Sequence, residues 1–466
     1  MPTYIWVLIQ LGSAAASVYH ILLYKRDPRS ALGWIMACVF IPYAGPFAYF
    51  LFGINRVRSR ARGMKRRLFN VAPESGQRAQ TPPKPGPGGL TDPGQRITGK
   101  TKSCGNLVTP LFNGEAAYPA MLDSIAKARQ RVFLSTFILK ADNTGTAFAR
   151  ALGAAADRGV EVMVLVDGIG EWYSLRKASS LLRQYKVRVA RFLPPRLFPP
   201  SIYINLRNHR KLLIVDNQVA YTGGMNISDD QTSLAGQARR VSDVHFHLLG
   251  PVVSELSEVF CRDWHFATHT PAVESGTPTP ETRGDMKCRV VPDGPDDELD
   301  SLALTIQTAI SAATESIDIM TPYFLPGREL MTALLSASLR GVKVQIILPG
   351  KNNLFYVHWA NRNLLGELLT WDIAAFYQPA PFCHSKLLCI DGNYSLIGSA
   401  NLDPRSLRLN FELGIEVFSE SLNHTLRTHF AQVLAVSTRI RPDDLARRSV
   451  RARLRDSAAA LLSPYL

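Results

Sequence analysis

The strongest constraint on the fold is a polar pattern that occurs twice inside apolar segments. The stretch NHRKLLIVDNQVAYTGGMN (208–226) has a counterpart in CHSKLLCIDGNYSLIGSANLD (383–403), and the second copy lies far along the chain from the first. A second pair of similar segments precedes them, DRGVEVMVLVDG (157–168) and LRGVKVQIILPG (339–350). These spacings are too long for a solenoid repeat and indicate the duplication of a domain-sized unit.

Within each copy, a histidine and a lysine two positions later share one face of an extended strand, because side chains alternate along a strand. Two buried polar groups side by side are costly without partners, so the pattern favours a shared ligand over a structural role. The aspartate that completes each pattern falls on the other face or at the strand end, where we expect it to brace the turn or bind a backbone group. The motif residues, grouped as catalytic candidates, are His209, Lys211 and Asp216 in the first copy and His384, Lys386 and Asp391 in the second.

Together the two copies supply the groups that a phosphate diester needs. A neutral histidine can attack phosphorus, and a protonated one can donate a proton to the departing alkoxide. Lysine ammonium groups and asparagine amides can stabilise charge on the phosphate oxygens, so we expect neither a metal nor a cofactor. The predicted phosphate-binding positions are Asn226 and Asn401 together with Gly224 and Ser399 in the turns before them.

Two acids are candidates to orient the histidines. Glu412 follows His384 in the second half, and Asp243 follows His209 in the first, each near a predicted strand. The alternative for either acid is an exposed charge on a strand. His245 and His247 follow Asp243 closely, and for them an ordinary role in the strand is the favoured interpretation.

The net charge of the 466-residue chain is +15, which predicts a negatively charged partner, either nucleic acid or an anionic membrane. The six cysteines are scattered without paired spacing. This pattern is typical of a reducing compartment and argues against a structural zinc site.

The N-terminal segment 1–67 is typical of a membrane anchor. Two uncharged segments, 4–24 and 31–52, are each about long enough to cross a bilayer core, which favours a transmembrane hairpin over a cleaved signal peptide. The segment 55–67 then carries seven basic residues and no acid. By the positive-inside rule, it places the downstream body in the cytoplasm, although the basic turn between the two spans argues against that topology.

Beyond the anchor, helical and fully apolar extended segments alternate, which indicates an α/β fold around a largely parallel or mixed sheet. Stretches rich in proline, glycine and threonine separate the folded parts. The predicted organisation is an anchor and basic segment (1–67), a linker (68–103), a first half (104–267), a second linker (268–286), and a second half with a helical tail (287–466).

The doubled HxKxxxxD pattern, with GGMN, GSANLDPRS and LNFE, resembles the phospholipase D superfamily. More narrowly, PYFLPGREL, RGVKVQIILPG and the N-terminal hairpin resemble bacterial cardiolipin synthases, over nearly the whole chain. The resemblance implies a pseudo-dimer of two α/β/α halves with one site at their interface. It implies His209 as the nucleophile, lysines and asparagines as phosphate ligands, and Asp243 and Glu412 as supporting acids. The chain departs from the family pattern at Ser135, Thr136 and Phe137, where the family often has Glu and Tyr.

The implied reaction transfers a phosphatidyl group from one phosphatidylglycerol to the hydroxyl of another and releases glycerol. The implied location is the bacterial inner membrane, with a multi-pass anchor and a cytoplasmic catalytic body. Two alternatives stay open: a phospholipase D that transfers to water, and a phosphodiesterase of nucleic acid. The anchor disfavours the second alternative, so we expect an anionic phospholipid and the membrane as partners and no nucleic acid. The acceptor alcohol and the oligomeric state stay open.

Overall fold

The computed structural model describes residues 3–25, 28–53, 92–174, 176–195, 206–236, 239–272, 279–295 and 298–461. The chain divides into two compact units. One is an N-terminal unit, Met1–Asn70 with Pro195–Ile202, and the other is a catalytic body, Val71–Pro194 with Tyr203–Leu466. The basic segment 55–67 and most of the predicted first linker lie outside the described residues.

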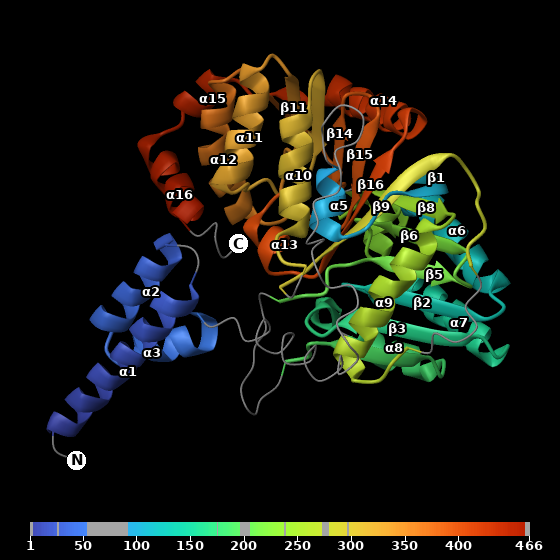
Figure 1. Cartoon of the computed structure of the whole chain (residues 1–466), viewed down its shortest axis with the longest axis horizontal. Helices are drawn as coiled ribbons and strands as arrows, with labels where there is room; N and C mark the ends of the chain where they lie inside the picture. Colours follow the sequence, from blue (N-terminus) through green and yellow to red (C-terminus); the bar gives the residue numbers. More distant parts are fainter. Residues whose placement is uncertain are drawn as a thin grey trace. The chain divides into compact units, whose positions relative to one another are not determined.

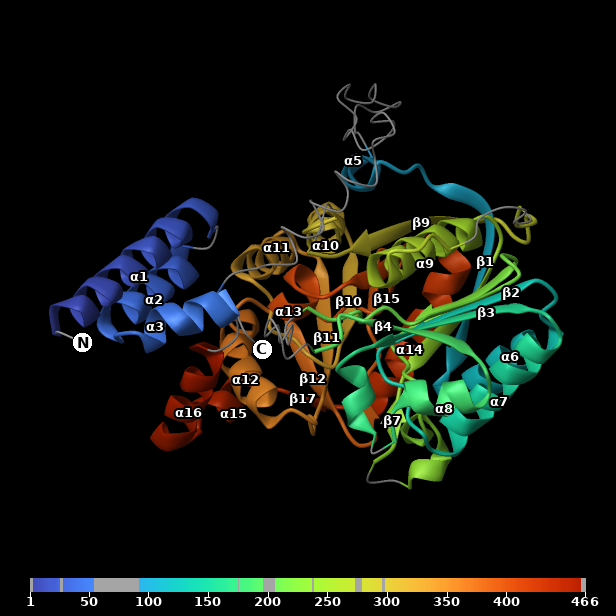
Figure 2. The same cartoon turned by 90° about the horizontal axis from the view of Figure 1, so that it is seen from below.

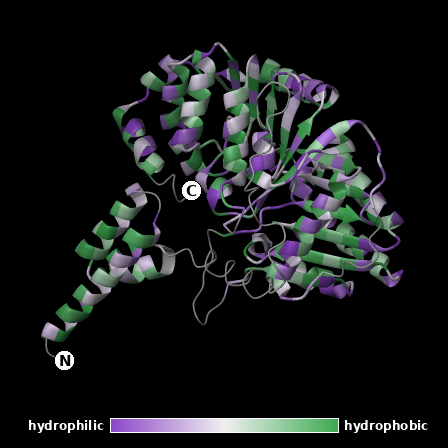
Figure 3. Ribbon diagram, in the orientation of Figure 1, coloured by the Kyte–Doolittle hydropathy of each residue, from purple (hydrophilic) through white to green (hydrophobic). Residues whose placement is uncertain are grey.

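The N-terminal unit contains one long apolar helix, α1 (Thr3–Tyr24), which is hydrophobic over most of its length (Figure 3). At 1.5 Å per residue its 22 residues extend about 33 Å, enough to cross a bilayer core. Among the described helices, it alone is both long and apolar enough to do so.

The second predicted span, 31–52, is not a single helix. It consists of α2 (Pro28–Phe40), α3 (Ala44–Ala48) and a π-helical turn (Tyr49–Gly53). The break falls at Pro42, which has no backbone N–H to continue the helical ladder. Because α2 has 13 residues and extends only about 20 Å, the transmembrane hairpin stays a prediction from the sequence.

In the described part of the catalytic body, fifteen strands form one mixed sheet in the order β17-β12-β11-β10-β14-β15-β16-β9-β1-β8-β6-β5-β2-β3-β4. The strands of the first half are β1 (Ser103–Phe112), β2 (Arg131–Thr136), β3 (Glu161–Asp167), β4 (Arg188–Phe192), β5 (Leu212–Val215), β6 (Val219–Gly223) and β8 (Val244–Leu249). Those of the second half are β9 (Met286–Asp293), β10 (Ser316–Met320), β11 (Lys343–Pro349), β12 (Ala374–Gln378), β14 (Leu387–Ile390), β15 (Tyr394–Gly398), β16 (Glu412–Phe418) and β17 (Thr438–Arg439). A separate pair joins β7 (Val241–Ser242) to β13 (Phe382–Cys383).

The strand order shows the duplication directly. Read outward from the antiparallel pair β1 and β9, the first half runs β1-β8-β6-β5-β2-β3-β4 and the second β9-β16-β15-β14-β10-β11-β12. In both halves the three outermost of these strands are parallel to one another and the others are antiparallel. The predicted α/β class and the duplicated halves are therefore confirmed.

Helices cover both faces of the sheet (Figure 1). Those of the first half are α6 (Asn113–Lys127), α7 (Asn143–Asp157), α8 (Ala178–Gln184) and α9 (Val252–Thr268), after a short α5 (Pro93–Thr98). Those of the second half are α10 (Ser301–Ala312), α11 (Arg328–Leu339), α12 (Phe355–Leu369), α13 (Pro404–Arg408), α14 (Glu420–Val436), α15 (Pro442–Ala446) and α16 (Val450–Leu461). In the first half, α6 and α7 lie on one side of the strands and α9 on the other (Figure 2). Phe260 of α9 stacks on Phe133 of β2 at 4.6 Å between ring centroids.

The predicted boundary at 104 stays a prediction, and the described part of the catalytic body includes residues on both sides of it. Asp92 caps α5 by accepting hydrogen bonds from the backbone N–H groups of Gly94 and Gln95, and β1 starts at Ser103. Between the halves, α9 ends at Thr268 and β9 begins at Met286, with residues 273–278 outside the described part. The remaining domain limits stay predictions.

Candidate active site

Each histidine of the repeated motif lies on a short segment that pairs with the other half of the body. The backbone N–H of His209 donates to the carbonyl of Phe411 at 2.9 Å, and the N–H of Phe411 donates to the carbonyl of Arg207 at 2.8 Å. In the second half, β13 pairs in parallel with β7, and the backbone N–H of His384 donates to the carbonyl of Ser242 at 2.8 Å. In each half, the backbone N–H of the histidine therefore bonds to the residue that precedes the acid of the other half.

The side chains repeat this exchange. Nδ1 of His209 lies 3.0 Å from Oε1 of Glu412, and Nδ1 of His384 lies 2.9 Å from Oδ2 of Asp243. In the sequence each acid follows the histidine of its own half, but the structure pairs each acid with the histidine of the other half. The reason is the backbone pairing, which sets the acid directly after the carbonyl that holds the opposite histidine.

The two acids have different supports. Glu412 accepts a hydrogen bond from the hydroxyl of Ser399 at 2.5 Å and another from the amide of Asn410 at 3.2 Å. Asp243 instead packs against Gly224, where an added Cβ would lie 2.5 Å from Oδ2. Ser399 and Gly224 thus have structural roles, because the first binds one acid and the second makes room for the other. Their binding of phosphate stays a prediction.

The two lysines are buried and fold back toward the histidines. Nζ of Lys211 donates to the carbonyl of His209 at 2.7 Å, and Nζ of Lys386 donates to the carbonyl of His384 at 2.6 Å. Burial lowers the pKa of Lys211 to about 7, with Glu412 opposing the shift. Burial likewise lowers the pKa of Lys386 to about 8, opposed by Asp243 and Glu412. The strand parity predicted from the sequence brings both lysines to the site.

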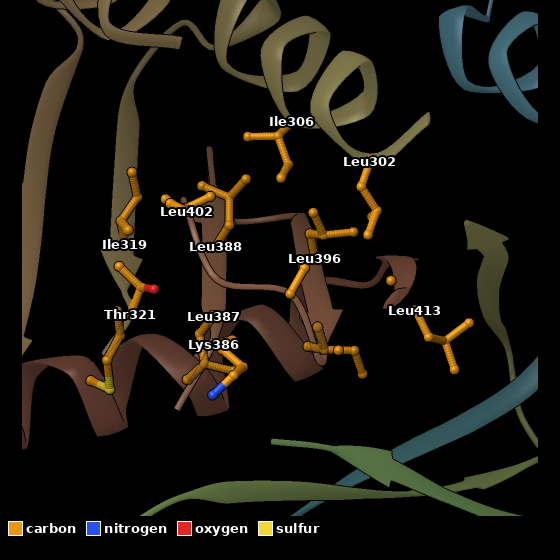
Figure 4. Close-up of a pocket in the computed structure, with 15 residues that line it drawn as sticks. Leu302, Ile306, Ile319, Thr321, Lys386, Leu387, Leu388, Leu396, Leu402 and Leu413 are labelled. Atoms are coloured by element: carbon orange, nitrogen blue, oxygen red, sulfur yellow. The ribbon is translucent and has the colours of Figure 1, made fainter. Parts of the chain in front are cut away.

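The stem of Lys386 is part of the wall of an apolar cavity in the second half (Figure 4). Its walls come from α10, β10, β14, β15 and β16, and include Leu302, Ile306, Leu388 and Leu396. Burial of the ammonium group disfavours its charged form, because water no longer solvates the charge.

Burial also lowers the pKa of both His209 and His384 to about 4. Glu412 opposes this shift at His209, while at His384 the charge of Lys386 adds to it and Asp243 opposes it. Burial alone would raise the pKa of Glu412, but His209 and Lys211 together hold it below its ordinary value. At pH 7 both imidazoles are therefore neutral in this arrangement and Glu412 is ionised.

The two predicted asparagines occupy equivalent turns but have different contacts. Oδ1 of Asn226 accepts from the backbone N–H of Ile138 at 3.3 Å, and its carbonyl accepts from the hydroxyl of Tyr118 at 2.6 Å. Asn401 is buried, and its Oδ1 has no hydrogen-bond partner among the described residues. Their role as phosphate ligands stays a prediction. Tyr118 was not predicted from the sequence, because it lies in α6, 108 residues before the asparagine that it supports.

The motif aspartates lie away from the histidines and bind backbone. Asp216 accepts three hydrogen bonds of 2.8 Å from the N–H groups of 129–131, and Asp391 accepts bonds of 2.7–2.9 Å from those of 314–316. These contacts fasten the β5–β6 and β14–β15 turns to the starts of β2 and β10. These contacts fit the bracing role that the strand parity indicated, and the grouping of both aspartates with the catalytic candidates stays a prediction.

Arg210 is a positioning residue that was not predicted from the sequence. Its guanidinium is buried and donates through Nε to the carbonyl of Glu412 at 2.8 Å and through Nη1 to Asp263 at 2.5 Å. It thus holds the backbone of the acid that binds His209. The second half has Ser385 at the equivalent place. The difference between HRK in the first motif and HSK in the second was therefore the sequence signal that the two halves differ at this position.

Aromatic rings lie beside both histidines. Phe137, one of the departures noted above, meets His209 edge-on at 5.2 Å between ring centroids. Phe382 lies 6.1 Å from His384 by the same measure. His245 and His247 belong to β8, where His247 stacks on Tyr221 at 5.0 Å, in keeping with the ordinary strand role expected for both.

Comparison with known proteins points to one family. The sequence matches the family described as "Cardiolipin synthase, PLD-like domain" over residues 121–264 and 306–434. Residues 14–53 match the family described as "Phospholipase_D-nuclease N-terminal". The first match covers both halves of the catalytic body.

Individual relatives agree. The chain is 30% identical to the major cardiolipin synthase ClsA of Bacillus subtilis, over 95% of each chain. It is 32% identical to cardiolipin synthase A of Pseudomonas aeruginosa, over 98% of this chain and 94% of that one. Among solved structures, phosphatidylserine synthase of Haemophilus influenzae has the same fold, with a TM-score of 0.61 and 13% identity over 77% of this chain and 95% of that one.

We predict that Arg210→Lys lowers kcat roughly tenfold, because a misplaced acid leaves His209 misaligned. Lysine keeps the charge beside Asp263 but lacks the planar fork that reaches the carbonyl of Glu412. In a Glu412→Gln background the orientation is already lost, so the same substitution should cause no further loss. Steady-state kinetics of the four proteins, with thermal unfolding as a check on folding, measures this. Losses that multiply in the double variant would contradict the positioning role.

We also predict that phosphate binding takes up protons at pH 8. An anion in the site favours the charged forms of Lys211 and Lys386, whose pKa values of about 7 and 8 leave them partly neutral at that pH. Calorimetric titration of the full chain with inorganic phosphate, in buffers of different ionisation enthalpy, measures the uptake. Lys211→Met should reduce it, whereas no uptake in the wild-type protein would show that the lysines are already charged.

Proposed function

This chain belongs to the cardiolipin synthases of the phospholipase D superfamily, and we propose from that premise how its site works. It is a phosphatidyltransferase. We propose that it moves a phosphatidyl group from one phosphatidylglycerol to the hydroxyl of a second and releases glycerol. The observation that carries the proposal is the pair of histidines at one interface, each with Nδ1 on an acid from the other half.

The acids determine which ring nitrogen of each histidine is free to react. A carboxylate at Nδ1 holds the proton there, so Nε2 is the atom left to react. Neutral His209 then has a free electron pair on Nε2 for attack at phosphorus. The hydrogen bonds that Glu412 receives from Ser399 and Asn410 support this acid as a fixed partner for His209.

In the first half of the reaction, a bond forms between Nε2 of His209 and phosphorus, and the bond from phosphorus to the glycerol oxygen breaks. Protonated His384 gives its Nε2 proton to that oxygen, so glycerol leaves as the neutral alcohol. Although the pKa of His384 is about 4, the phosphodiester brings a negative charge beside it, and this charge favours the protonated imidazole.

In the second half, neutral His384 takes the proton from the hydroxyl of the acceptor phosphatidylglycerol. The acceptor oxygen attacks phosphorus, the bond to His209 breaks, and the product carries two phosphatidyl groups on one glycerol. His384 is then protonated again for the next cycle. Lys211, Lys386 and the two asparagines are the groups proposed to stabilise charge on the phosphate oxygens. That the reaction needs no metal or cofactor stays a prediction.

We further propose that the enzyme works at the bacterial inner membrane with its body in the cytoplasm. The support is the apolar helix α1 and the basic sequence 55–67, whose seven positive charges and lack of acids favour the cytoplasmic side. An anionic phospholipid substrate also fits the net charge of +15.

We test the function with the full chain reconstituted in phosphatidylglycerol vesicles. The proposal predicts cardiolipin and glycerol in equal amounts, whereas phosphatidic acid as the main product would show transfer to water. Acid-quenched mass spectrometry should find the phosphatidyl adduct on His209. With a substrate whose leaving group needs little protonation, His384→Ala should accumulate this adduct and His209→Ala should form none. An adduct on His384 in the wild-type enzyme would reverse the two roles.

A further inference from the structure

We infer that the catalytic body has a lipid-docking surface of its own, which binds an anionic bilayer next to the site. The surface consists of α16, the N-terminal end of α12 and the 3-10 turn Gly170–Tyr173, and we call it the docking surface. The inference rests on the proposed function in one respect, since it supposes that the substrate lies in a bilayer.

The first observation is an exposed apolar stripe along α16. Val450, Leu454 and Leu461 follow one another at intervals of four and seven residues, which places them on one side of a helix. All three are strongly exposed, Leu454 to 66%. Arg451 and Arg453 are exposed on the same helix to either side of the stripe. An apolar stripe flanked by arginines is typical of helices that lie in the headgroup region of a membrane.

The opposite side of α16 packs against the body. The exposed stripe is therefore not the buried face of a helix that has detached from the core. Ala459 is buried in a small apolar cluster with Val357 and Ala360 of α12. Arg455 lies over the ring of Trp359 at 4.4 Å. Figures 1 and 2 show α16 alongside α12. The helix therefore presents the stripe outward from a defined position.

The second observation is that exposed aromatic side chains lie at the start of α12 and in the 3-10 turn. Phe355, at the start of α12, is 62% exposed and lies 4.8 Å from Trp359 between ring centroids. In the first half, Trp172 and Tyr173 of the 3-10 turn are 68% and 59% exposed. Tryptophan, tyrosine and phenylalanine at such positions favour the boundary between headgroups and acyl chains.

The aromatic side chains connect the docking surface to the histidines. Tyr173 lies 5.9 Å from Phe137, which in turn lies 5.2 Å from His209. From the helix pair, Tyr323 packs against the cluster that contains Ala459 and lies 6.5 Å from Phe382, which in turn lies 6.1 Å from His384. These ring contacts connect the docking surface to both histidines.

The positive charge of the C-terminal helices favours an anionic bilayer as the partner of the docking surface. Residues 441–461 contain six arginines and three aspartates, and Asp456 is already paired with Arg448 and Arg455. The excess of positive charge beside an apolar stripe matches an anionic bilayer, whose surface attracts arginine and accepts apolar side chains. Other exposed apolar residues of the body, such as Leu339 and Val436, lie on separate helices and lack this combination.

The test places an environment-sensitive fluorophore on Leu454→Cys in the full chain, with exposed Cys104 replaced by serine. The matched control is Val436→Cys on α14, since Val436 is 65% exposed and Leu454 66%. The protein is reconstituted in vesicles of phosphatidylglycerol and phosphatidylcholine with brominated acyl chains. We expect strong quenching at 454 and little at 436. Equal quenching at the two positions, or none at 454, would overturn the inference, and protection at 454 without quenching would indicate a protein partner instead.

A second measurement separates this inference from the proposed function. Val450→Asp with Leu454→Asp should lower turnover of phosphatidylglycerol in bilayers roughly tenfold, because two apolar side chains no longer enter the membrane. Turnover of a short-chain, monomeric phosphatidylglycerol should stay unchanged, as should both activities in Val436→Asp. Equal loss on both substrates would contradict docking. A wild-type protein that acts on neither substrate would refute the proposed function, while the quenching result would still decide the docking surface.

Discussion

The exchange of acids between the two halves is the interaction on which the site depends. Glu412 holds His209 and Asp243 holds His384, and in each case a backbone hydrogen bond one residue earlier fixes the same crossing. Neither half therefore contains both members of a histidine–acid pair. The pairing brings both candidate catalytic segments to one place at the interface, and the antiparallel pairing of β1 with β9 joins the two halves in one continuous sheet.

Burial gives the site its electrostatic character. Two lysines and two histidines are withdrawn from water, and burial lowers the pKa of all four. The charge of Lys386 also lowers the pKa of Lys211, while Glu412 and Asp243 oppose the shift at both lysines. A negatively charged phosphodiester placed beside the lysines would favour their charged forms. The same groups thus select an anionic substrate and place protons where the reaction needs them.

The sequence predicted those features that depend on local pattern. Strand alternation brought His209 and Lys211 to one face, and the repeated spacing predicted two equivalent halves. The exchange of acids was not predictable by counting along the chain, because it arises from pairing between segments that are far apart in sequence and belong to different halves. Arg210 was missed because an arginine between two motif residues carries no visible partner in a sequence. Pro42 indicated the break in the second apolar segment. The prediction of a single span rested on the apolar composition of 31–52 and did not take this proline into account.

The most direct test of the exchange is nitrogen-15 NMR of the full chain with labelled histidines, which number ten. Signals are assigned with the two histidine-to-alanine variants. We expect that Glu412→Gln moves the Nδ1 resonance of His209 and leaves that of His384 in place, while Asp243→Asn does the reverse. If Glu412→Gln moved the His384 resonance instead, each half would orient its own histidine, and a shared site built by crossing would be contradicted.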